Sequence, residues 1–159
     1  MKQGLGTQLR HLIELLDSAV ATSYAEAGLD YRPRFTPVIR ALAAKEPRTI
    51  GDIATAAGIT QPAATQTVAL MLKKDLLNSV SSAADGRQRL IGLSDRGRAL
   101  LPQLHRCWAA TTAAAASLDA DLPYPLSEVL AQAIAALEQQ PFGARIRDAR
   151  ERTHNKEPT

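Results

Sequence analysis

The chain has 159 residues, a net charge of +3 and 45% hydrophobic residues, but only 4% of its residues are aromatic. This length fits one domain, or a small domain with helical extensions used for association, and the many alanines indicate closely packed helices. The shortage of aromatic side chains argues against a protein that stacks single-stranded bases. The mild positive charge is compatible with a polyanionic partner without establishing one.

The cysteine content and the apolar segment near the N-terminus indicate the cellular compartment of this protein. Cys107 is the sole cysteine, which excludes a disulfide within the chain and a thiolate-rich zinc site and favours a reducing environment. Glu14 and Asp17 interrupt the apolar stretch near the N-terminus, and no run approaches the ~18 apolar residues of a membrane span. We therefore expect a soluble cytoplasmic protein with no membrane partner.

Two helices are predicted near the N-terminus. Over 5–27 the apolar residues recur at helical spacing, and Gly28 fits the C-terminal cap of this helix. A second helix opens at Tyr31 and runs to about Lys45, with Pro37 near its first turn. The apolar residues that recur in the first helix are Leu5, Leu9, Leu12, Leu16, Ala19 and Val20, and the residues expected to face inward in the second are Val38, Ile39 and Leu42.

A helix, a tight turn and another helix follow in the middle of the chain. Thr49 can cap the first of these helices, and Gly58 supplies the turn. Thr60 can cap the second helix, where the missing N–H of Pro62 costs little because the first turn has no partner for it. The inward positions are Ile50, Ile53 and Ala54 in the first helix and Ala64, Val68 and Met71 in the second.

A β-hairpin is predicted after this helix pair. Alternating residues indicate strands at 76–80 and 88–93, joined by a turn at 81–86. The return strand has two apolar residues on one face, Ile91 and Leu93. Asp85 either forms a surface ion pair with Arg87 or orients it towards a narrow minor groove. A helix pair followed by such a hairpin is a winged helix-turn-helix, and this arrangement indicates double-stranded DNA as the partner.

The outward face of the second central helix is polar but uncharged. It carries Gln61, Pro62, Thr65, Gln66 and Ala69. Glutamine can pair bidentately with adenine, and threonine or alanine can contact the thymine methyl group. Basic residues flank this face, namely Arg48, Lys73, Lys74, Arg87 and Arg89. This placement predicts base reading by the helix and phosphate contacts around it. The predicted DNA-binding residues are Thr49, Thr60, Gln61, Pro62, Ala63, Thr65, Gln66, Lys73, Arg87 and Arg89.

Four motifs in this region together resemble the multiple-antibiotic-resistance regulator (MarR) family. They are Ile53-Ala54, the run from Gly58 to Gln66, Asp85-Gly86-Arg87 and the run from Leu93 to Arg98. The resemblance covers about residues 31–101 and implies a mainly α fold with a small β wing, whose N- and C-terminal helices intertwine in an obligate homodimer. It further implies that two copies bind successive major grooves of a pseudo-palindrome and that Arg87 is the wing arginine.

Asp75 departs from the pattern of this family, which usually ends the recognition helix with glycine. Aspartate tolerates the left-handed conformation less readily than glycine but better than most residues. We therefore expect the turn at the end of this helix to be retained.

The rest of the chain is predicted to be helical and then frayed. Ser94 caps a helix that reaches about Leu118 and contains Pro102, and a last helix begins near Leu126. From Arg145 onward arginines alternate with acids and apolar residues become scarce, so we expect a frayed tail. The predicted regions are a dimerisation helix at 1–30, the winged helix-turn-helix DNA-binding region at 31–98, C-terminal dimerisation helices at 99–144 and a basic tail at 145–159.

A small-molecule effector is a further expectation from the resemblance, which implies a site between the dimer helices and the reading unit. The candidate residues are His11, Tyr24, Tyr31, Phe35, His105 and Trp108. Core packing explains the same spacing and is the alternative for each of them. Cys107 is either a thiol switch or a buried structural cysteine. His105 and Cys107 are two residues apart and point in different directions on a helix, so no metal and no cofactor are predicted.

The leading hypothesis is a sequence-specific transcription regulator, a homodimeric repressor of a pseudo-palindromic operator that a small ligand releases. One alternative is a winged-helix scaffold that binds partner proteins and no operator, and another is a regulator switched by the Cys107 thiol. An enzyme is not expected, because the sequence offers no set of nucleophile, base and orienting residue and no glycine loop for phosphate.

Overall fold

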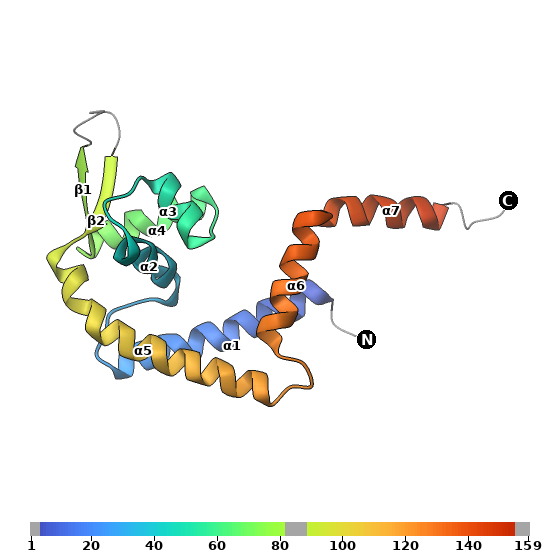
Figure 1. Ribbon diagram of the computed structural model, residues 1–159, viewed down its shortest axis with the longest axis horizontal. Coiled ribbons are helices and arrows are strands. Elements are labelled where there is room, and N and C mark those ends of the chain that lie inside the picture. Colours follow the sequence, from blue (N-terminus) through green and yellow to red (C-terminus); the bar gives the residue numbers. More distant parts are fainter. Residues whose placement is uncertain (1–3, 82–88, 155–159) are drawn as a thin grey trace. The chain divides into compact units, whose positions relative to one another are not determined.

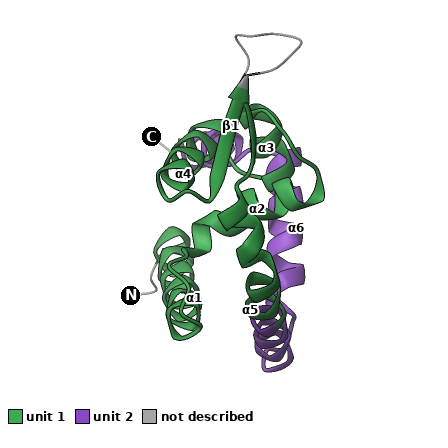
Figure 2. Ribbon diagram, turned by 90° about the vertical axis from the view of Figure 1, so that its left-hand side faces the viewer, with its two compact units in different colours: residues 1–109 green, residues 110–159 purple. Residues whose placement is uncertain are grey.

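The computed structural model describes residues 4–81 and 89–154 (Figure 1). The chain forms two compact units, Met1–Ala109 and Ala110–Thr159, and each is described by itself (Figure 2). The elements are α1 (Leu5–Glu26), the 3-10 helix η1 (Pro33–Phe35), α2 (Thr36–Ala44), α3 (Ile50–Ala57), α4 (Gln61–Lys73), β1 (Leu77–Ser81), β2 (Arg89–Leu93), α5 (Asp95–Ala120), α6 (Leu126–Gln139) and α7 (Phe142–His154). Over the described ranges, no helix is long and apolar enough to cross a membrane.

Helix α1 ends in the glycine cap that the sequence predicts. Gly28 has a φ of +73°, and its N–H donates to the carbonyl of Ala25 at 2.9 Å. The N–H of Leu29 donates to the carbonyl of Tyr24, also at 2.9 Å. This pair of bonds is a Schellman cap, which requires a left-handed residue and satisfies two carbonyls that a helix end leaves free.

The second predicted helix is divided in the structure. Pro33 begins the short helix η1, and α2 starts only at Thr36, with Pro37 in its first turn. A proline fixes its own φ and restricts the residue before it, so two prolines four residues apart explain the two short segments. The predicted inward residues of α2 are confirmed, since Val38, Ile39 and Leu42 are all buried.

The helix-turn-helix of α3 and α4 has the predicted caps. Thr49 Oγ1 accepts a hydrogen bond from the N–H of Asp52 at 3.1 Å, and Thr60 Oγ1 accepts one from the N–H of Ala63 at 3.4 Å. Gly58, between the two helices, is left-handed with a φ of +65°. Each cap satisfies a donor that the first turn of a helix cannot pair internally.

The two strands form an antiparallel hairpin. β1 is shifted by one residue from the predicted range 76–80, and β2 ends at Leu93 as predicted, while its predicted first residue, Gln88, lies outside the described residues. Leu77 pairs with Leu93 and Ser79 with Ile91, so the two apolar residues of β2 share one face and are both buried. Arg48 adds a bridge on the other side of β2. Its N–H donates to the carbonyl of Ile91 at 2.9 Å and its carbonyl accepts from the N–H of Ile91 at 2.7 Å.

The core of the first unit joins α1, α2, the helix-turn-helix, the hairpin and the first half of α5. Its largest fully buried side chains include Tyr24, Phe35, Ile39, Leu42, Ile53, Met71, Ile91 and Leu104. The start of α5 is fixed by Ser94, whose Oγ accepts from the N–H of Gly97 at 2.9 Å. Ser94 therefore caps α5 as predicted, and the helix continues through Pro102.

The second unit contains the end of α5 together with α6 and α7. The Oδ1 atom of Asp119 accepts from the backbone N–H of Ser127 at 3.2 Å, and its Oδ2 accepts from the Ser127 hydroxyl. These hydrogen bonds hold the pKa of Asp119 below its ordinary value. They tie the end of α5 to the first turn of α6.

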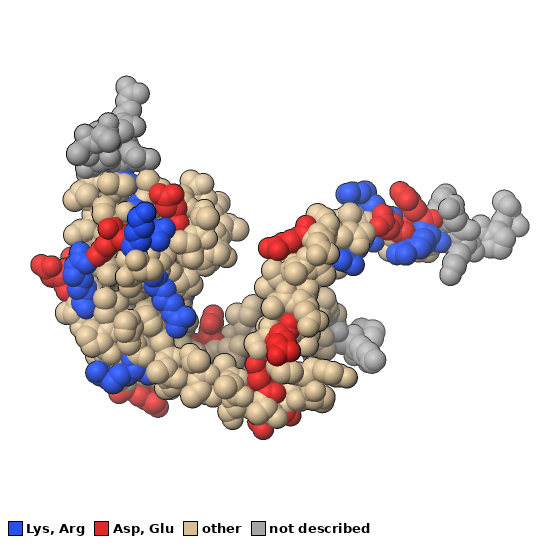
Figure 3. All heavy atoms as spheres, in the orientation of Figure 1, with Lys and Arg blue, Asp and Glu red and all other residues tan. Residues whose placement is uncertain are grey.

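The segment expected to fray from Arg145 lies largely within α7, which extends as a helix to His154. The Arg145 side chain donates to the carbonyls of Ala136 and Gln140 at 3.0 and 3.1 Å, which satisfies acceptors at the end of α6. Gln140 also donates to Asp148 at 3.0 Å. Figure 3 shows basic and acidic side chains interspersed along α7, a pattern that supports an exposed helix.

Candidate DNA-binding interface

The helix α4 is held by one apolar face. Ala64, Val68 and Met71 are buried as predicted, and Thr67 is buried beside them. These residues recur at three- and four-residue spacing, so a single side of the helix packs on the core. The opposite side remains exposed to solvent.

The exposed side of α4 is neutral over its whole described length before Lys73. Its exposed residues are Gln61, Pro62, Ala63, Thr65, Gln66 and Ala69. The hydroxyl of Thr65 donates to the carbonyl of Gln61 at 2.9 Å, which leaves its lone pairs and its methyl group directed to solvent. Gln61 and Gln66 each offer an amide that can donate and accept at once, which is the chemistry that base edges require.

Two predicted DNA-binding residues act first as helix caps. Thr60 is exposed and binds the backbone of Ala63, whereas Thr49 is half-buried and also donates to Asp52 Oδ2 at 2.8 Å. Both therefore lie at the N-termini of α3 and α4, where backbone N–H groups favour negative charge. Their contact with DNA phosphate stays a prediction.

The basic residues around α4 differ in whether an acidic residue of the protein pairs with them. Lys73 and Arg89 are exposed, and Arg89 begins β2 opposite Ser81. Lys74 forms an ion pair with Asp30, and this neighbour holds the pKa of the Asp30 carboxyl below its ordinary value. No local pattern predicts this ion pair, because Asp30 and Lys74 are far apart along the chain. Lys74 is therefore the basic residue of this group whose charge is already balanced within the protein.

Arg87 and Asp85, predicted to lie at the tip of the wing, are outside the described residues. Arg87 as the wing arginine stays a prediction. On the face drawn in Figure 3, acidic and basic side chains are interspersed over the first unit, and they form no continuous basic patch there.

The aromatic residues predicted to line an effector site are packed against one another. Tyr24 and Tyr31 meet edge to face with ring centroids 4.9 Å apart, and Phe35 meets Tyr31 at 5.6 Å. Trp108 Nε1 donates to the hydroxyl of Tyr24 at 3.1 Å. The residues missed by the sequence analysis include Thr36, whose Oγ1 lies 3.2 Å from the Tyr24 hydroxyl and accepts from Tyr31 at 3.4 Å.

The Tyr31 phenol is buried, and this burial raises its pKa above the ordinary value. The hydrogen bond to Thr36 lowers the pKa, but its effect is smaller. The remaining candidates lie elsewhere on the surface: His11 is exposed on α1, and His105 is exposed with its ring 5.3 Å from that of Trp108. An effector site at these residues stays a prediction.

Cys107 is buried in α5, and the structure does not test the thiol-switch alternative. In the part of the chain that the structure describes, no three His, Cys, Asp or Glu side chains gather as a metal site requires.

The capped helix pair, the antiparallel hairpin and the bridging residue Arg48 define a winged helix-turn-helix protein. Residues 35–88 match the model of the MarR family, which confirms the predicted resemblance over this segment. The comparison with curated proteins gave no match.

Solved structures of regulators share this fold. BpsR of Bordetella bronchiseptica, whose DNA binding is regulated by 6-hydroxynicotinic acid, is 19% identical with a TM-score of 0.64, covering 87% of this chain and 94% of its own. The repressor CouR bound to a 23-mer DNA duplex is 22% identical with a TM-score of 0.64, covering 85% and 92%. MepR of S. aureus in complex with DNA is 17% identical with a TM-score of 0.67, covering 87% and 98%.

Proposed function

We propose that this protein is a DNA-binding transcription regulator, a homodimeric repressor that reads a pseudo-palindromic operator with α4 and is released by a small ligand. The observation that carries the proposal is the neutral, hydrogen-bonding outer face of a helix whose other face is buried. A solvated helix with no reading role gains solubility from Lys and Glu, whereas base edges are read by amides, hydroxyls and methyl groups.

The apolar surfaces outside the reading unit support a homodimer. Leu5, Ile13 and Leu16 are exposed on α1 at 66%, 56% and 45%, and Val129, Leu130, Ile134 and Leu137 are exposed on α6. Large apolar side chains in such rows are costly in water, and a second copy offers the same rows in return. Sedimentation equilibrium tests this part, because Ile13→Glu should give monomers where Glu14→Gln does not.

Release by a ligand is supported by what is known of a similar protein. The DNA binding of BpsR is regulated by 6-hydroxynicotinic acid. In the proposed mechanism the dimer has two states that differ in the spacing of its two α4 helices, and only one of them binds the operator. A ligand that binds the other state more tightly shifts the dimer towards it and so lowers the affinity for the operator. The experiments on DNA are therefore repeated with candidate ligands.

The test of the reading role is selection of bound fragments from genomic DNA by the purified protein. We expect an enriched palindrome, and Gln66→Ala should reduce discrimination among operator variants by ~1–3 kcal/mol at the affected base pair. Gln132→Ala, an exposed glutamine on α6, is the matched control and should leave discrimination unchanged. Absence of any enriched palindrome would favour the scaffold alternative, and an equal loss on every sequence would make Gln66 an anchor.

The phosphate contacts have a separate readout. Arg87→Ala and Arg89→Ala should weaken binding to all sequences alike and reduce the slope of log affinity against log salt by ~1 each. An unchanged slope for both variants would contradict the assignment of the wing to phosphate or minor-groove contact.

A further inference from the structure

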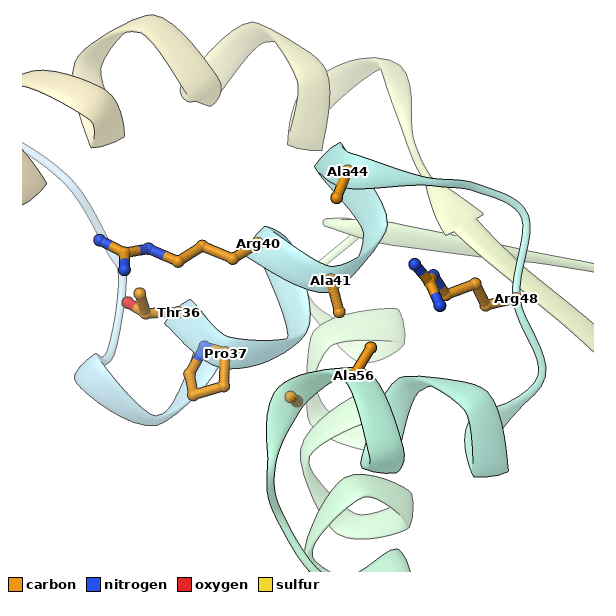
Figure 4. A pocket seen from close by; sticks show the side chains of 8 residues that line it. Thr36, Pro37, Arg40, Ala41, Ala44, Arg48 and Ala56 are labelled. Atoms are coloured by element: carbon orange, nitrogen blue, oxygen red, sulfur yellow. The ribbon is translucent and has the colours of Figure 1, made fainter. Parts of the chain in front are cut away.

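A pocket between α2 and α3 is lined by two arginines, Arg40 and Arg48. Its volume is about 520 Å³. Figure 4 shows Ala41 of α2 and Ala56 of α3 facing each other across it, with Arg40 towards one end and Arg48 towards the other. The pocket therefore has an apolar middle and a cation at each end.

Neither arginine of this pocket has a carboxylate partner among the described residues. The ion pairs there are Lys74 with Asp30 and Arg98 with Glu46. Arg48 donates through Nε to the carbonyl of Lys45 at 2.8 Å, which fixes the side chain and leaves its Nη atoms for another acceptor. The Arg40 guanidinium lies over the ring of Trp108, 4.7 Å from its centroid, where it gains only the modest attraction of a cation–π contact.

We propose that this pocket binds an elongated organic dianion, an α,ω-dicarboxylate, with one carboxylate on each arginine and its methylene chain along the alanines. A guanidinium binds a carboxylate through two parallel hydrogen bonds, which no neutral ligand can match. Two cations at separate ends select against a compact anion, which reaches only one of them, and the alanine walls favour an apolar chain.

The pocket is connected to the helices on either side of α2. Thr36 lines it and also contacts the hydroxyls of Tyr24 and Tyr31, and Arg40 lines it and covers Trp108 of α5. A carboxylate that binds the edge of the Arg40 guanidinium neutralises the charge that lies over the Trp108 ring. The position of α2 against α1 and α5 then depends on the ligand. An effect of the ligand on DNA binding rests on the proposed function, whereas binding itself does not.

The experiment uses the full chain and three dicarboxylates of increasing length, succinate, adipate and suberate. Trp108 is the single tryptophan, so its emission reports on Arg40 directly. We expect a saturable change in emission that is strongest for one chain length. Hexanoate and inorganic phosphate, which can occupy only one end, should bind ~10-fold more weakly or worse. An equal response to phosphate would overturn the proposal.

Two variants and a matched control assign the site. Arg48→Gln should weaken dicarboxylate binding ~10-fold or more, and Arg40→Gln should do the same when binding is measured by calorimetry, because this change also alters the tryptophan signal. Lys45→Gln removes an exposed charge next to the pocket and should change affinity less than ~2-fold. Each variant is first checked for an unchanged melting temperature. Affinity that is equal in the wild type and in Arg48→Gln would overturn the assignment.

Selection of DNA fragments is measured on the same samples, so that the two proposals fail separately. Dicarboxylate binding without any enriched palindrome would overturn the proposed DNA function and support the pocket. An enriched palindrome with no binding of any of the three dicarboxylates would overturn the pocket alone. If Arg40→Gln and Arg48→Gln lower the salt slope of DNA binding and no dicarboxylate binds, the arginines contact DNA phosphate and the proposal is wrong.

Discussion

Among the glycines of the described residues, Gly97 is the one at which an added Cβ would come closest to a neighbouring atom. A Cβ at this residue would lie 2.1 Å from the carbonyl oxygen of Leu76 and 3.2 Å from its carbonyl carbon. Non-bonded atoms pack best near ~3.5 Å, so Gly97→Ala would force the start of β1 and the start of α5 apart by ~1 Å. The neighbouring atoms are backbone, and no side chain can rotate away to make space.

The size of the effect follows from what this movement would disturb. The carbonyl of Leu76 accepts from the N–H of Ser94 at 3.1 Å, and Leu76 itself is buried in the core. Overpacking costs ~1–3 kcal/mol and a weakened hydrogen bond ~1 kcal/mol, while alanine regains ~1 kcal/mol of helix propensity. Gly97→Ala should therefore lower the free energy of unfolding by ~2 kcal/mol, measured by urea titration of the helical circular dichroism signal.

Gly51→Ala is the matched control, since Gly51 lies inside α3 and the nearest atom to its added Cβ is Thr49 Oγ1 at 3.8 Å. This variant should be more stable than the wild type by up to ~1 kcal/mol, because the gain in helix propensity is not opposed. A Gly97→Ala protein as stable as Gly51→Ala would refute the reasoning from the close approach.

Three further substitutions test separate features of the first unit by the same titration. Asp75→Gly should stabilise the protein by ~1 kcal/mol, because Asp75 has a φ of +54° and glycine adopts this conformation without steric cost. Asp75→Ala should destabilise it, and an alanine variant more stable than the glycine variant would contradict this reasoning. Glu46→Ala should cost ~1–3 kcal/mol, since Glu46 Oε2 accepts from the N–H of Leu93 at 2.6 Å, and Glu46→Gln, which keeps an acceptor, should cost less. Burial raises the pKa of Tyr31, so the stability that the neutral phenol contributes is complete below pH ~10 and is lost as the pH rises further. While only the unfolded state ionises, the free energy of unfolding should fall by ~1.4 kcal/mol per pH unit. Tyr31→Phe should flatten this alkaline decline, and an unchanged slope in the variant would contradict the prediction.

The parts of the fold that sequence predicts are those set by local chemistry. Thr49, Thr60 and Ser94 cap their helices because a hydroxyl beside the first turn satisfies donors two or three residues ahead. Gly28 and Gly58 end helices because the left-handed conformation is cheapest for glycine. In each case the cause lies within a few residues of the effect, so spacing alone reveals it.

Contacts between segments that are distant along the chain were not predicted, because spacing reveals only effects whose cause lies within a few residues. Lys74 pairs with Asp30 and Thr36 joins two tyrosines, and no local pattern marks either contact. The apolar and charged spacing of the chain also gave no sign that Arg40 and Arg48 would line one pocket. For α7, low hydrophobicity favoured a frayed tail, but hydrogen bonds from Arg145 to the end of α6 support a helix.

The junction around Ser94 connects the end of α4 to the start of α5. Asp75 ends α4 with a left-handed turn, in which the N–H of Leu76 donates to the carbonyl of Met71 at 3.0 Å. Ser94 Oγ donates to the carbonyl of Asp75 at 2.6 Å and accepts from Gly97, so one side chain binds the last turn of α4 and the first turn of α5. The close approach at Gly97 makes this junction stiff. In the proposed dimer, a rotation of α5 would therefore carry α4 with it, and the spacing between the two reading helices would follow the geometry of the dimer helices.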